Sequence, residues 1–565
     1  MIKSKSNSIL GIISFVCVIP PAASRSRFGC LNVDVNVVSV NIGRLVDLKN
    51  IAVPVGSSPP LQCRGCSAAV SQISDIQQDQ GGSDWTCEFC SQHNRFDSSS
   101  SSSAPSMPSC DMLYLHEDTD GDYVNLEDLL VVFCVDISGS MCVTAEVEIS
   151  NAVTTPVHVS RLQSIQDAIQ RSLTFLLQTC PQGRVALVTF NDEVTVYGDG
   201  TGVPLMLKEW ELMDFDFLKS QGQQFTCPRC VAESIDTLRC RVQEMREHGS
   251  TALGPAALVS VAMASRYSGS KVIICTDGLA NTGLGYIDDA CQSSSYFYRN
   301  LANEAAEKGV IVSVLTFEGT DCRLAEVGRL ADRTGGRVNI VNINTVSSEI
   351  QSVLEDNVIA TNVKATFLIA EGMYFKYEDH SHHKLVKEIG NVTEDLEITY
   401  QFGIKESSLQ NFIQRDKVPF QLQLDFKTRD LQRATRILTL EKSVVPDSSL
   451  VKDSLNVAVL GVHCAQLTAR LTMDGRVREA HREVLAQREL LQHMGERNQE
   501  EDVYENWINT MTVICDDLSS TPQSKSREGK KQSPGSTMKV LSDEVANVVY
   551  RFKRANSIML KKQGQ

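Results

Sequence analysis

The sequence predicts an α/β protein centred on a doubly wound, mostly parallel sheet, with a small cysteine module before it and a β-sandwich and a C-terminal helical region after it. Three observations lead to this prediction. Continuous apolar strands alternate with helical segments in the middle of the 565-residue chain, two CxxC pairs precede them, and the last third turns first to alternating strands and then to helices. Strands that are apolar throughout are buried on both faces, as in a parallel sheet covered by helices.

The composition is that of an acidic globular protein. The formal net charge is −15, with 42% hydrophobic and 22% charged residues. This balance excludes a wholly disordered chain and argues against a protein that binds nucleic acid over its whole surface. The stretch from residue 525 onward differs, because it holds ten Lys or Arg against three acidic residues. A basic tail can contact an anionic membrane or nucleic acid, but we expect an ordinary solvated helix and tail here.

The N-terminus allows three interpretations. Lys3 and Lys5 precede an apolar run over residues 9–19, and small residues and prolines follow, which is the layout of a secretory signal. The alternatives are a buried strand and a mis-assigned start of the chain. Neither this run nor any other reaches the ~20 residues that span a bilayer, so we expect no transmembrane anchor. We expect a cytoplasmic protein; the alternative is a secreted one, in which Asn391 of the sequon Asn-Val-Thr would carry a sugar.

Four cysteines form the clearest motif near the start of the chain. They follow the pattern C-x2-C-x20-C-x2-C, at Cys63, Cys66, Cys87 and Cys90. Each CxxC turn places two thiolates where both reach one ion at about 2.3 Å, and two such turns complete a tetrahedron. The pattern therefore predicts an N-terminal zinc ribbon whose Zn²⁺ is structural, with no open position for chemistry.

The middle of the chain alternates strands with helices. Because each strand is followed by a helix, the strands are expected to lie parallel. The expected strands are 130–135, 184–190, 271–276, 310–316 and 338–341, and the expected helices are 162–177, 251–265, 300–308, 324–331 and 346–354.

Oxygen ligands follow two of these strands. Asp136, Ser138 and Ser140 stand at i, i+2 and i+4 after the strand 130–135, and Asp277 follows the strand 271–276. The segment 248–254, which holds Ser250 and Thr251, opens a helix with a hydroxyl that can point back to the same edge. Carboxylates and hydroxyls suit Mg²⁺, and the carboxyl ends of parallel strands are where open α/β sheets bind ligands. We therefore expect a magnesium site there.

The remaining chain is expected to contribute other modules. Strands are expected at 364–370, 396–402, 420–426 and 434–440, helices at 464–473 and 476–494, and a last amphipathic helix at 538–555. The expected divisions are 1–56 (an N-terminal segment with possible strands of the β-sandwich), 57–97 (zinc ribbon), 98–128 (linker), 129–358 (α/β domain), 359–450 (β-sandwich), 451–516 (helical domain) and 517–565 (basic linker and tail helix).

Together, these motifs resemble the von Willebrand factor A (VWA) family. The metal-ion-dependent adhesion site (MIDAS) of that family is DxSxS with a distal Thr and a distal Asp, which Asp136, Ser138, Ser140, Thr251 and Asp277 match. The resemblance covers about residues 129–358. It implies that the hydroxyls contact Mg²⁺ directly or nearly so, that the aspartates act largely through water, and that an Asp or Glu of a protein partner completes the octahedron.

The order of modules is similar to that of the COPII inner-coat subunits, in which a zinc finger precedes an A-domain trunk, a β-sandwich and a helical domain. Two departures are the complete metal site and the lack of an evident gelsolin-like domain. The circularly permutated Ras protein family is more similar, because its members join such a finger to an intact A domain. The chain has no G-x-x-x-x-G-K-[ST] phosphate loop, so no residues are assigned to GTP hydrolysis.

The leading functional expectation is a non-enzymatic binding protein, because no catalytic constellation can be identified from the sequence. Its Mg²⁺ would take a carboxylate from a protein partner, while the ribbon and sandwich brace the A domain. One alternative is a COPII-like coat or trafficking component that acts on a small GTPase through Arg470, Arg476 or Arg478. A second is a secreted adhesion protein.

A third CxxC pair is less informative. Cys227 and Cys230, with Cys240 and His248, can bind a second zinc or form a redox pair. Their spacing is unfamiliar, so we expect an ordinary surface insertion.

Overall fold

The structure is a computed structural model in which most of the chain is described. The described residues are 13–16, 36–49, 53–56, 58–79, 82–97, 109–116, 129–147, 157–287, 293–378, 382–415, 417–430, 432–444, 456–498, 508 and 541–556.

The central sheet has seven strands in the order β12–β11–β10–β7–β13–β14–β15. The last five of these run parallel, and β11 and β12 are antiparallel at one edge, which confirms the predicted doubly wound, mostly parallel sheet. The strands are β7 (Leu130–Asp136), β10 (Arg184–Phe190), β11 (Val194–Gly198), β12 (Leu205–Leu207), β13 (Lys271–Thr276), β14 (Ile311–Phe317) and β15 (Val338–Val341).

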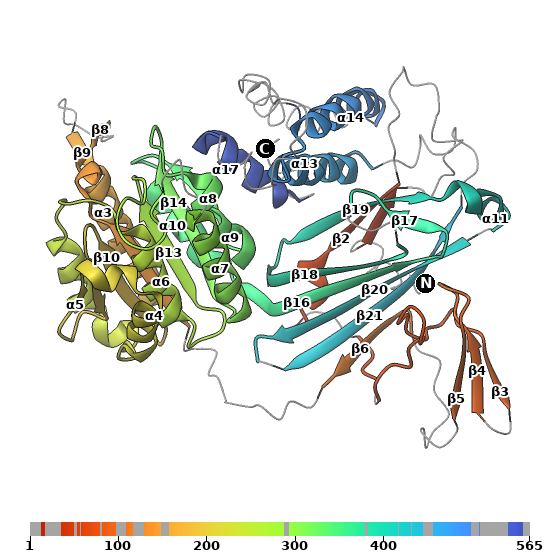
Figure 1. Cartoon of the computed structure of the whole chain (residues 1–565). Helices are drawn as coiled ribbons and strands as arrows, with labels where there is room; N and C mark the ends of the chain where they lie inside the picture. The colour runs from red at the N-terminus through yellow and green to blue at the C-terminus, as the bar shows by residue number, and fades with distance from the viewer. Residues whose placement is uncertain are drawn as a thin grey trace, which may run out of the picture.

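Helices cover both faces of this sheet (Figure 1). One face packs on α3 (Arg161–Thr179), α5 (Val231–Glu244) and α10 (Val346–Glu355). The other packs on α4 (Phe215–Gln224), α6 (Leu253–Ala264), α7 (Ser293–Glu307), α8 (Leu324–Val327) and α9 (Arg329–Thr334). Every residue of α6 is buried, because this helix has the sheet on one side and neighbouring helices on the other.

The structure differs from the expected elements in two places. The segment 324–331, expected as one element, is divided into α8 and α9 at Gly328, where an added Cβ would lie 2.5 Å from the ring of Tyr550. The chain before Thr251, where we expected an ordinary surface insertion, contains β11, β12, α4 and α5. These elements bury short apolar stripes that are too interrupted to stand out in the sequence.

The β-sandwich consists of two antiparallel sheets, ordered β1–β2–β19–β17 and β18–β16–β20–β21–β6. Their facing sides share one core that includes Phe367, Phe402 and Phe420. The strands are β1 (Ile13–Val16), β2 (Val37–Asn41), β6 (Asp111–Leu115), β16 (Val358–Ile369), β17 (Met373–Phe375), β18 (Lys384–Thr393), β19 (Glu397–Ile404), β20 (Lys417–Thr428) and β21 (Arg433–Ser443); the short helices are α2 (Ile42–Val46), η5 (Glu406–Ser408) and α11 (Leu409–Ile413).

Three separate stretches of chain therefore build the sandwich. The segment 98–128, expected to be a linker, contributes β6, because buried Asp111 forms an ion pair with buried Arg436 of β21 (2.6 Å). Residues 13–16 of the N-terminal apolar run form β1, which pairs with β2 from Ile13 opposite Val40. This is the strand alternative for that run, and its other residues lie outside the described part of the chain.

The cysteine module and the helices flank the sandwich (Figure 1). The module has three strands, β3 (Ile76–Asp79), β4 (Gly82–Thr86) and β5 (His93–Asp97), and is fixed to β20 by hydrogen bonds from Gln421 and Gln423 to its backbone. Helices α13 (Val457–Met473) and α14 (Val477–Asn498) form the expected antiparallel hairpin. The last described helix, α17 (Asp543–Lys553), packs against α13, α8 and β15, so it joins the helical hairpin to the central sheet.

No helix among the described residues combines the length and the apolar character needed to cross a membrane.

Candidate metal centres

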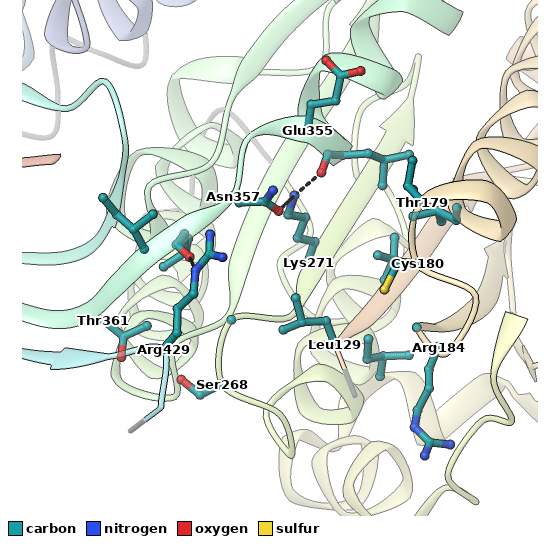
Figure 2. A pocket seen from close by; sticks show the side chains of 18 of the residues that line it. Leu129, Thr179, Cys180, Arg184, Ser268, Lys271, Glu355, Asn357, Thr361 and Arg429 are labelled. Atoms are coloured by element: carbon teal, nitrogen blue, oxygen red, sulfur yellow. Dashed lines mark hydrogen bonds between the residues drawn. The ribbon is translucent and has the colours of Figure 1, made fainter. Parts of the chain in front are cut away.

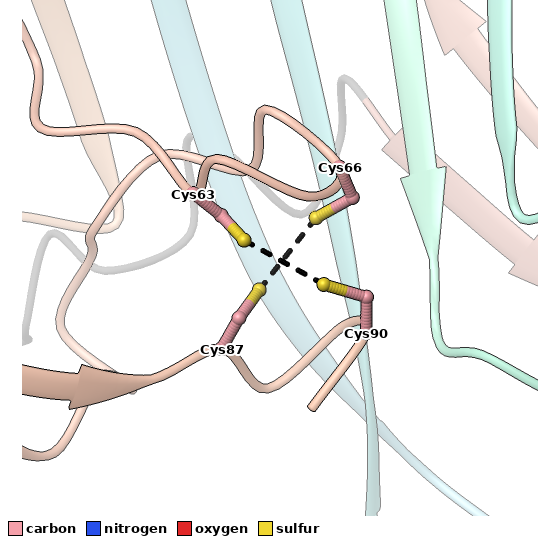
Figure 3. A group of neighbouring side chains, drawn as sticks. All are labelled: Cys63, Cys66, Cys87 and Cys90. Atoms are coloured by element: carbon pink, nitrogen blue, oxygen red, sulfur yellow. Dashed lines mark hydrogen bonds between the residues drawn. The ribbon is translucent and has the colours of Figure 1, made fainter. Parts of the chain in front are cut away.

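The four cysteines converge on one point (Figure 3). All four sulfur atoms lie within 4.8 Å of one another, with 3.5 Å between Cys63 and Cys90 and 3.6 Å between Cys66 and Cys87. A tetrahedron with Zn–S bonds of about 2.3 Å has sulfur separations of about 3.8 Å, so the four thiols fit Zn²⁺ closely. The zinc-ribbon arrangement expected from the spacing is thus present.

The two CxxC turns have the same backbone geometry. Ser67 and Ser91, each directly after the second cysteine of its pair, have positive φ angles of 67° and 58°. Each donates its N–H to the carbonyl of the first cysteine of its pair, at 2.9 and 2.8 Å. Burial raises the pKa of the Cys90 thiol to about 11. Since three of the four cysteines are buried, a bound Zn²⁺ would be closed to solvent and would serve structure rather than chemistry.

The second cluster lies at the carboxyl edge of the central sheet, where β7 ends at Asp136. Asp136 is fully buried; one carboxylate oxygen accepts the Ser138 N–H (2.8 Å) and the other accepts the Thr276 hydroxyl (2.6 Å). Burial raises the pKa of Asp136 to about 6, while these hydrogen bonds favour its charged form. The Ser138 and Ser140 hydroxyl oxygens are 3.1 Å apart, so the DxSxS turn gathers its oxygen donors at one place.

Thr251 and Asp277 reach the same place from other elements. The Ser140 hydroxyl donates to Asp277 (2.5 Å), which is buried directly after β13. A Cβ added at Gly278 would lie 3.3 Å from the Thr251 hydroxyl oxygen and 3.5 Å from that of Ser140, so these two oxygens border the same small space. All five predicted residues therefore lie at one edge. Two carboxylates and three hydroxyls are hard donors of the kind Mg²⁺ prefers, so the residues fit the ion.

A glycine connects the two loops that carry these donors. Gly249 has a φ of +79°, and a Cβ there would meet the carboxylate oxygen of Asp192 at 2.1 Å. Its carbonyl accepts the Gly139 N–H (3.1 Å). Only glycine permits this approach, which ties the Thr251 loop to the DxSxS turn.

One residue of this edge was not predicted from the sequence. Arg161, the first residue of α3, donates to the second carboxylate oxygen of Asp277 (2.6 Å), and its guanidinium lies 5.5 Å from the centre of the Phe317 ring. The available signal was the capping box of Ser160 and Gln163, which starts the helix at Arg161 rather than at Leu162. The charge of Asp277 is therefore compensated within the protein itself.

The third CxxC pair does not form a metal site in the described part of the chain. Cys63, Cys66, Cys87 and Cys90 are the one group of three or more His, Cys, Asp or Glu side chains found close enough there to share an ion. The sulfur of Cys227 instead lies 2.7 Å from the Tyr267 hydroxyl, and Cys240 is exposed on α5.

A cavity of about 450 Å³ lies at the opposite edge of the sheet, where the parallel strands begin (Figure 2). Lys271 lines it, but its ammonium group already donates to the carbonyls of Val353 (3.0 Å) and Leu354 and to Asn357 (3.4 Å). Arg429 likewise donates to the carbonyl of Val358 (3.0 Å). These cations bind backbone carbonyls where the central sheet meets the sandwich. We therefore interpret the cavity as a gap between two packed domains and not as a ligand site.

Among solved structures, the fold of this chain is similar to that of human COPII-coat protein Sec24c. The two superpose with a TM-score of 0.62, covering 97% of this chain and 76% of that chain at 13% identity. A von Willebrand factor type A protein from Catenulispora acidiphila covers 68% of this chain and 82% of that chain at 13% identity, with a TM-score of 0.42, and adds nothing further to the fold assignment.

In sequence, the chain is similar to Circularly permutated Ras protein 1 of Dictyostelium discoideum. The two are 26% identical over 496 residues, which are 84% of this chain and 58% of that protein. The resemblances expected from the sequence are thereby confirmed. The chain spans a little over half the length of this relative, and no family model matches the chain.

Proposed function

We propose that this chain is a non-enzymatic scaffold that binds a protein partner through Mg²⁺. Asp136, Ser138, Ser140, Thr251 and Asp277 would hold the ion, and an Asp or Glu side chain of the partner would complete its coordination. The observation that supports this most strongly is the convergence of all five side chains on the carboxyl edge of the sheet. There the Ser140 hydroxyl lies 3.1 Å from that of Ser138, donates to Asp277 and borders the same small space as the Thr251 hydroxyl. When bound, Mg²⁺ supplies a positive centre for a carboxylate. The Zn²⁺ of the ribbon would be structural.

The metal part of this proposal is tested by calorimetric titration of the full chain with Mg²⁺. We expect one bound ion in the wild type and none in Asp136→Ala or in Asp136→Asn, which keeps the side-chain volume. Asp167→Ala is the matched control, because Asp167 is 57% exposed on α3 and its carboxylate pairs with Arg171 of the same helix. Unchanged Mg²⁺ binding in both Asp136 variants would contradict the assignment.

The partner part is tested by comparing capture of a protein partner in Mg²⁺ and in EDTA. We expect capture to require the ion and to be lost in Asp136→Asn. Capture that survives both EDTA and the substitution would show that the partner binds elsewhere on the chain.

We propose a cytoplasmic location, because free thiols in a four-cysteine cluster suit a reducing compartment. The buried state of Asn391 also supports this proposal. Its side-chain nitrogen donates to the carbonyls of Val310 (3.1 Å) and Thr334 (3.0 Å), and the residue is 3% exposed. A sugar on that nitrogen would have no room in the folded chain, which weakens the secreted alternative.

A second candidate function is a coat or trafficking component that acts with a small GTPase. The similarity to Sec24c over nearly the whole chain favours it, as does the similarity to a protein named for Ras. Among the three arginines considered, Arg470 pairs with Glu378 (2.5 Å) and Arg476 with Glu479 (2.7 Å), whereas Arg478 is exposed on α14.

This candidate is tested with a panel of purified GTP-loaded small GTPases. It predicts faster GTP hydrolysis by one member in the presence of the chain, with the stimulation lost in Arg478→Ala and kept in Arg482→Ala, an exposed control on the same helix. No stimulation of any member would count against it.

A further inference from the structure

Several large apolar side chains in the described part of the chain lie exposed near the candidate magnesium site, and four of them come from the segment 206–213 and the loop after Asp277. Met206 belongs to β12, Trp210 and Met213 belong to η4 (Glu209–Met213), and Tyr286 lies in the loop after Asp277; their exposed fractions are 52%, 62%, 63% and 49%. We call these four residues the apolar rim. Large apolar residues that gather on one exposed surface mark interaction sites more often than scattered ones do.

The register of the sheet places the rim at the same edge as the metal ligands. Leu207 of β12 lies opposite Val194, Val194 opposite Phe190, and Phe190 opposite Asp136. This row crosses the sheet directly, so η4 leaves the sheet at the level where Asp136 ends β7. With three strand spacings of about 4.8 Å each, Leu207 lies about 14 Å from Asp136.

A hydrogen-bonded loop joins the rim to the metal ligands. Asn281 accepts the Thr251 N–H (2.7 Å), and the hydroxyls of Ser250 and Thr282 are 2.9 Å apart. Further along the same loop, Leu284 donates its N–H to the carbonyl of Leu212 in η4 (2.9 Å). The loop from Asp277 to Ile287 therefore bonds to a metal-ligand loop at one end and to the rim at the other.

The turn that presents Trp210 is held in an unfavourable conformation. Glu209 has a φ of +55°, in the left-handed region that residues other than glycine rarely adopt. The Trp210 ring packs on Phe217 at 5.4 Å between ring centres, yet most of it stays exposed. Backbone strain of this kind persists mainly where function needs the geometry.

Charge around the rim restricts what can bind there. Glu209, Asp214 and Asp216 are exposed beside Trp210 and Met213, against one exposed basic residue of the same segment, Lys208. A strongly acidic surface would be repelled here, whereas a segment with apolar and basic side chains would be attracted.

We propose that the apolar rim and the magnesium site form one docking surface for an extended segment of a partner protein. The segment would place one carboxylate on the ion and an apolar side chain, flanked by a basic residue, on Trp210 and Met213. This inference rests on the proposed function and names the chemistry of its partner.

The test is selection of a random peptide library, displayed on phage, against the immobilised full chain in Mg²⁺, followed by affinity measurement with the selected synthetic peptides. We expect the selected peptides to share an acidic residue and an aromatic or aliphatic residue at a constant spacing. Trp210→Ala and Met213→Ser should each weaken binding about tenfold or more, as for residues central to an interface, while Mg²⁺ binding stays unchanged. Leu485→Ala, at an exposed apolar residue of α14, is the matched control and should have no effect.

The outcomes separate this inference from the proposed function. The docking surface alone would be overturned by peptides that bind in Mg²⁺ and lose binding in Asp136→Asn but bind Trp210→Ala and Met213→Ser as tightly as the wild type. Peptides that bind equally well in EDTA, or a library that yields no Mg²⁺-dependent peptide, would overturn the proposed function as well. Self-association of the chain that Trp210→Ala abolishes would assign the rim to a second copy and would also overturn the proposal.

Discussion

Replacing Arg161 by Met should strengthen Mg²⁺ binding and lower the folding stability of the metal-free protein. In the wild type, the Arg161 guanidinium lies 2.6 Å from the Asp277 carboxylate, and the two side chains are 14% and 0% exposed. The positive charge of Arg161 therefore repels a Mg²⁺ ion that binds near the same carboxylate. Methionine keeps an apolar chain against Phe317 but removes the charge.

The expected magnitude follows from Coulomb's law. A single charge and a divalent ion about 7 Å apart repel by about 1 kcal/mol at the dielectric constant of water and by about 5 kcal/mol at an effective value of about 20. Since the site lies at a partly solvated edge, we expect an intermediate gain of about 2 kcal/mol, or roughly thirtyfold in the dissociation constant. Without Mg²⁺, an unpaired buried Asp277 should cost up to about 3–5 kcal/mol of stability.

Two measurements on the full chain test this reasoning: calorimetric Mg²⁺ titration, and thermal denaturation in EDTA and in Mg²⁺. Arg161→Met should have a lower melting temperature than the wild type in EDTA. Its melting temperature should rise more on addition of Mg²⁺ than that of the wild type, because a ligand that binds only the folded state stabilises it. Arg171→Met is the control, since Arg171 is 71% exposed on the same helix. Mg²⁺ affinity that falls or stays equal in Arg161→Met would refute the argument.

Three further predictions concern the frame around the site. Arg436→Ala leaves Asp111 buried without its partner. Hydrogen exchange should therefore report a free energy of opening of β6 and β21 that is lower by about 3–5 kcal/mol. A free energy of opening within about 1 kcal/mol of the wild-type value would contradict this pairing. Native mass spectrometry should count one Zn²⁺, lost in Cys90→Ser but kept in Cys240→Ser, whose thiol is exposed. Burial lowers the pKa of Lys271 to about 8 from 10.5, so the unfolded chain binds the extra proton between these values and stability should rise with pH there, by at most about 3 kcal/mol. Lys271→Met should flatten that rise in urea denaturation, and equal slopes would count against it.

The sequence was most informative where one short pattern fixes the geometry. The strands before Asp136 and Asp277 are buried throughout, and each ends where a ligand begins, so the sheet and the ligands that follow its strands could be predicted from periodicity and spacing. The assignment of Thr251 came from the resemblance to the VWA family. Prediction from the sequence was poorest where a strand pairs with residues far away along the chain. Strand β6 looks like linker because its burial depends on Arg436, which lies 325 positions further along the chain.

The sequence by itself determined which side chains are candidate metal ligands: the four cysteines at their fixed spacing, four oxygen donors that follow strand ends, and Thr251 at the start of a helix. Only the tertiary structure decided what surrounds them. Arg161 meets Asp277 across 116 positions, and η4 reaches the metal-site edge through the register of the sheet. The physical reason is that ligand spacing is a local property of the backbone, whereas charge compensation and exposed surface arise from packing between segments that no local pattern connects.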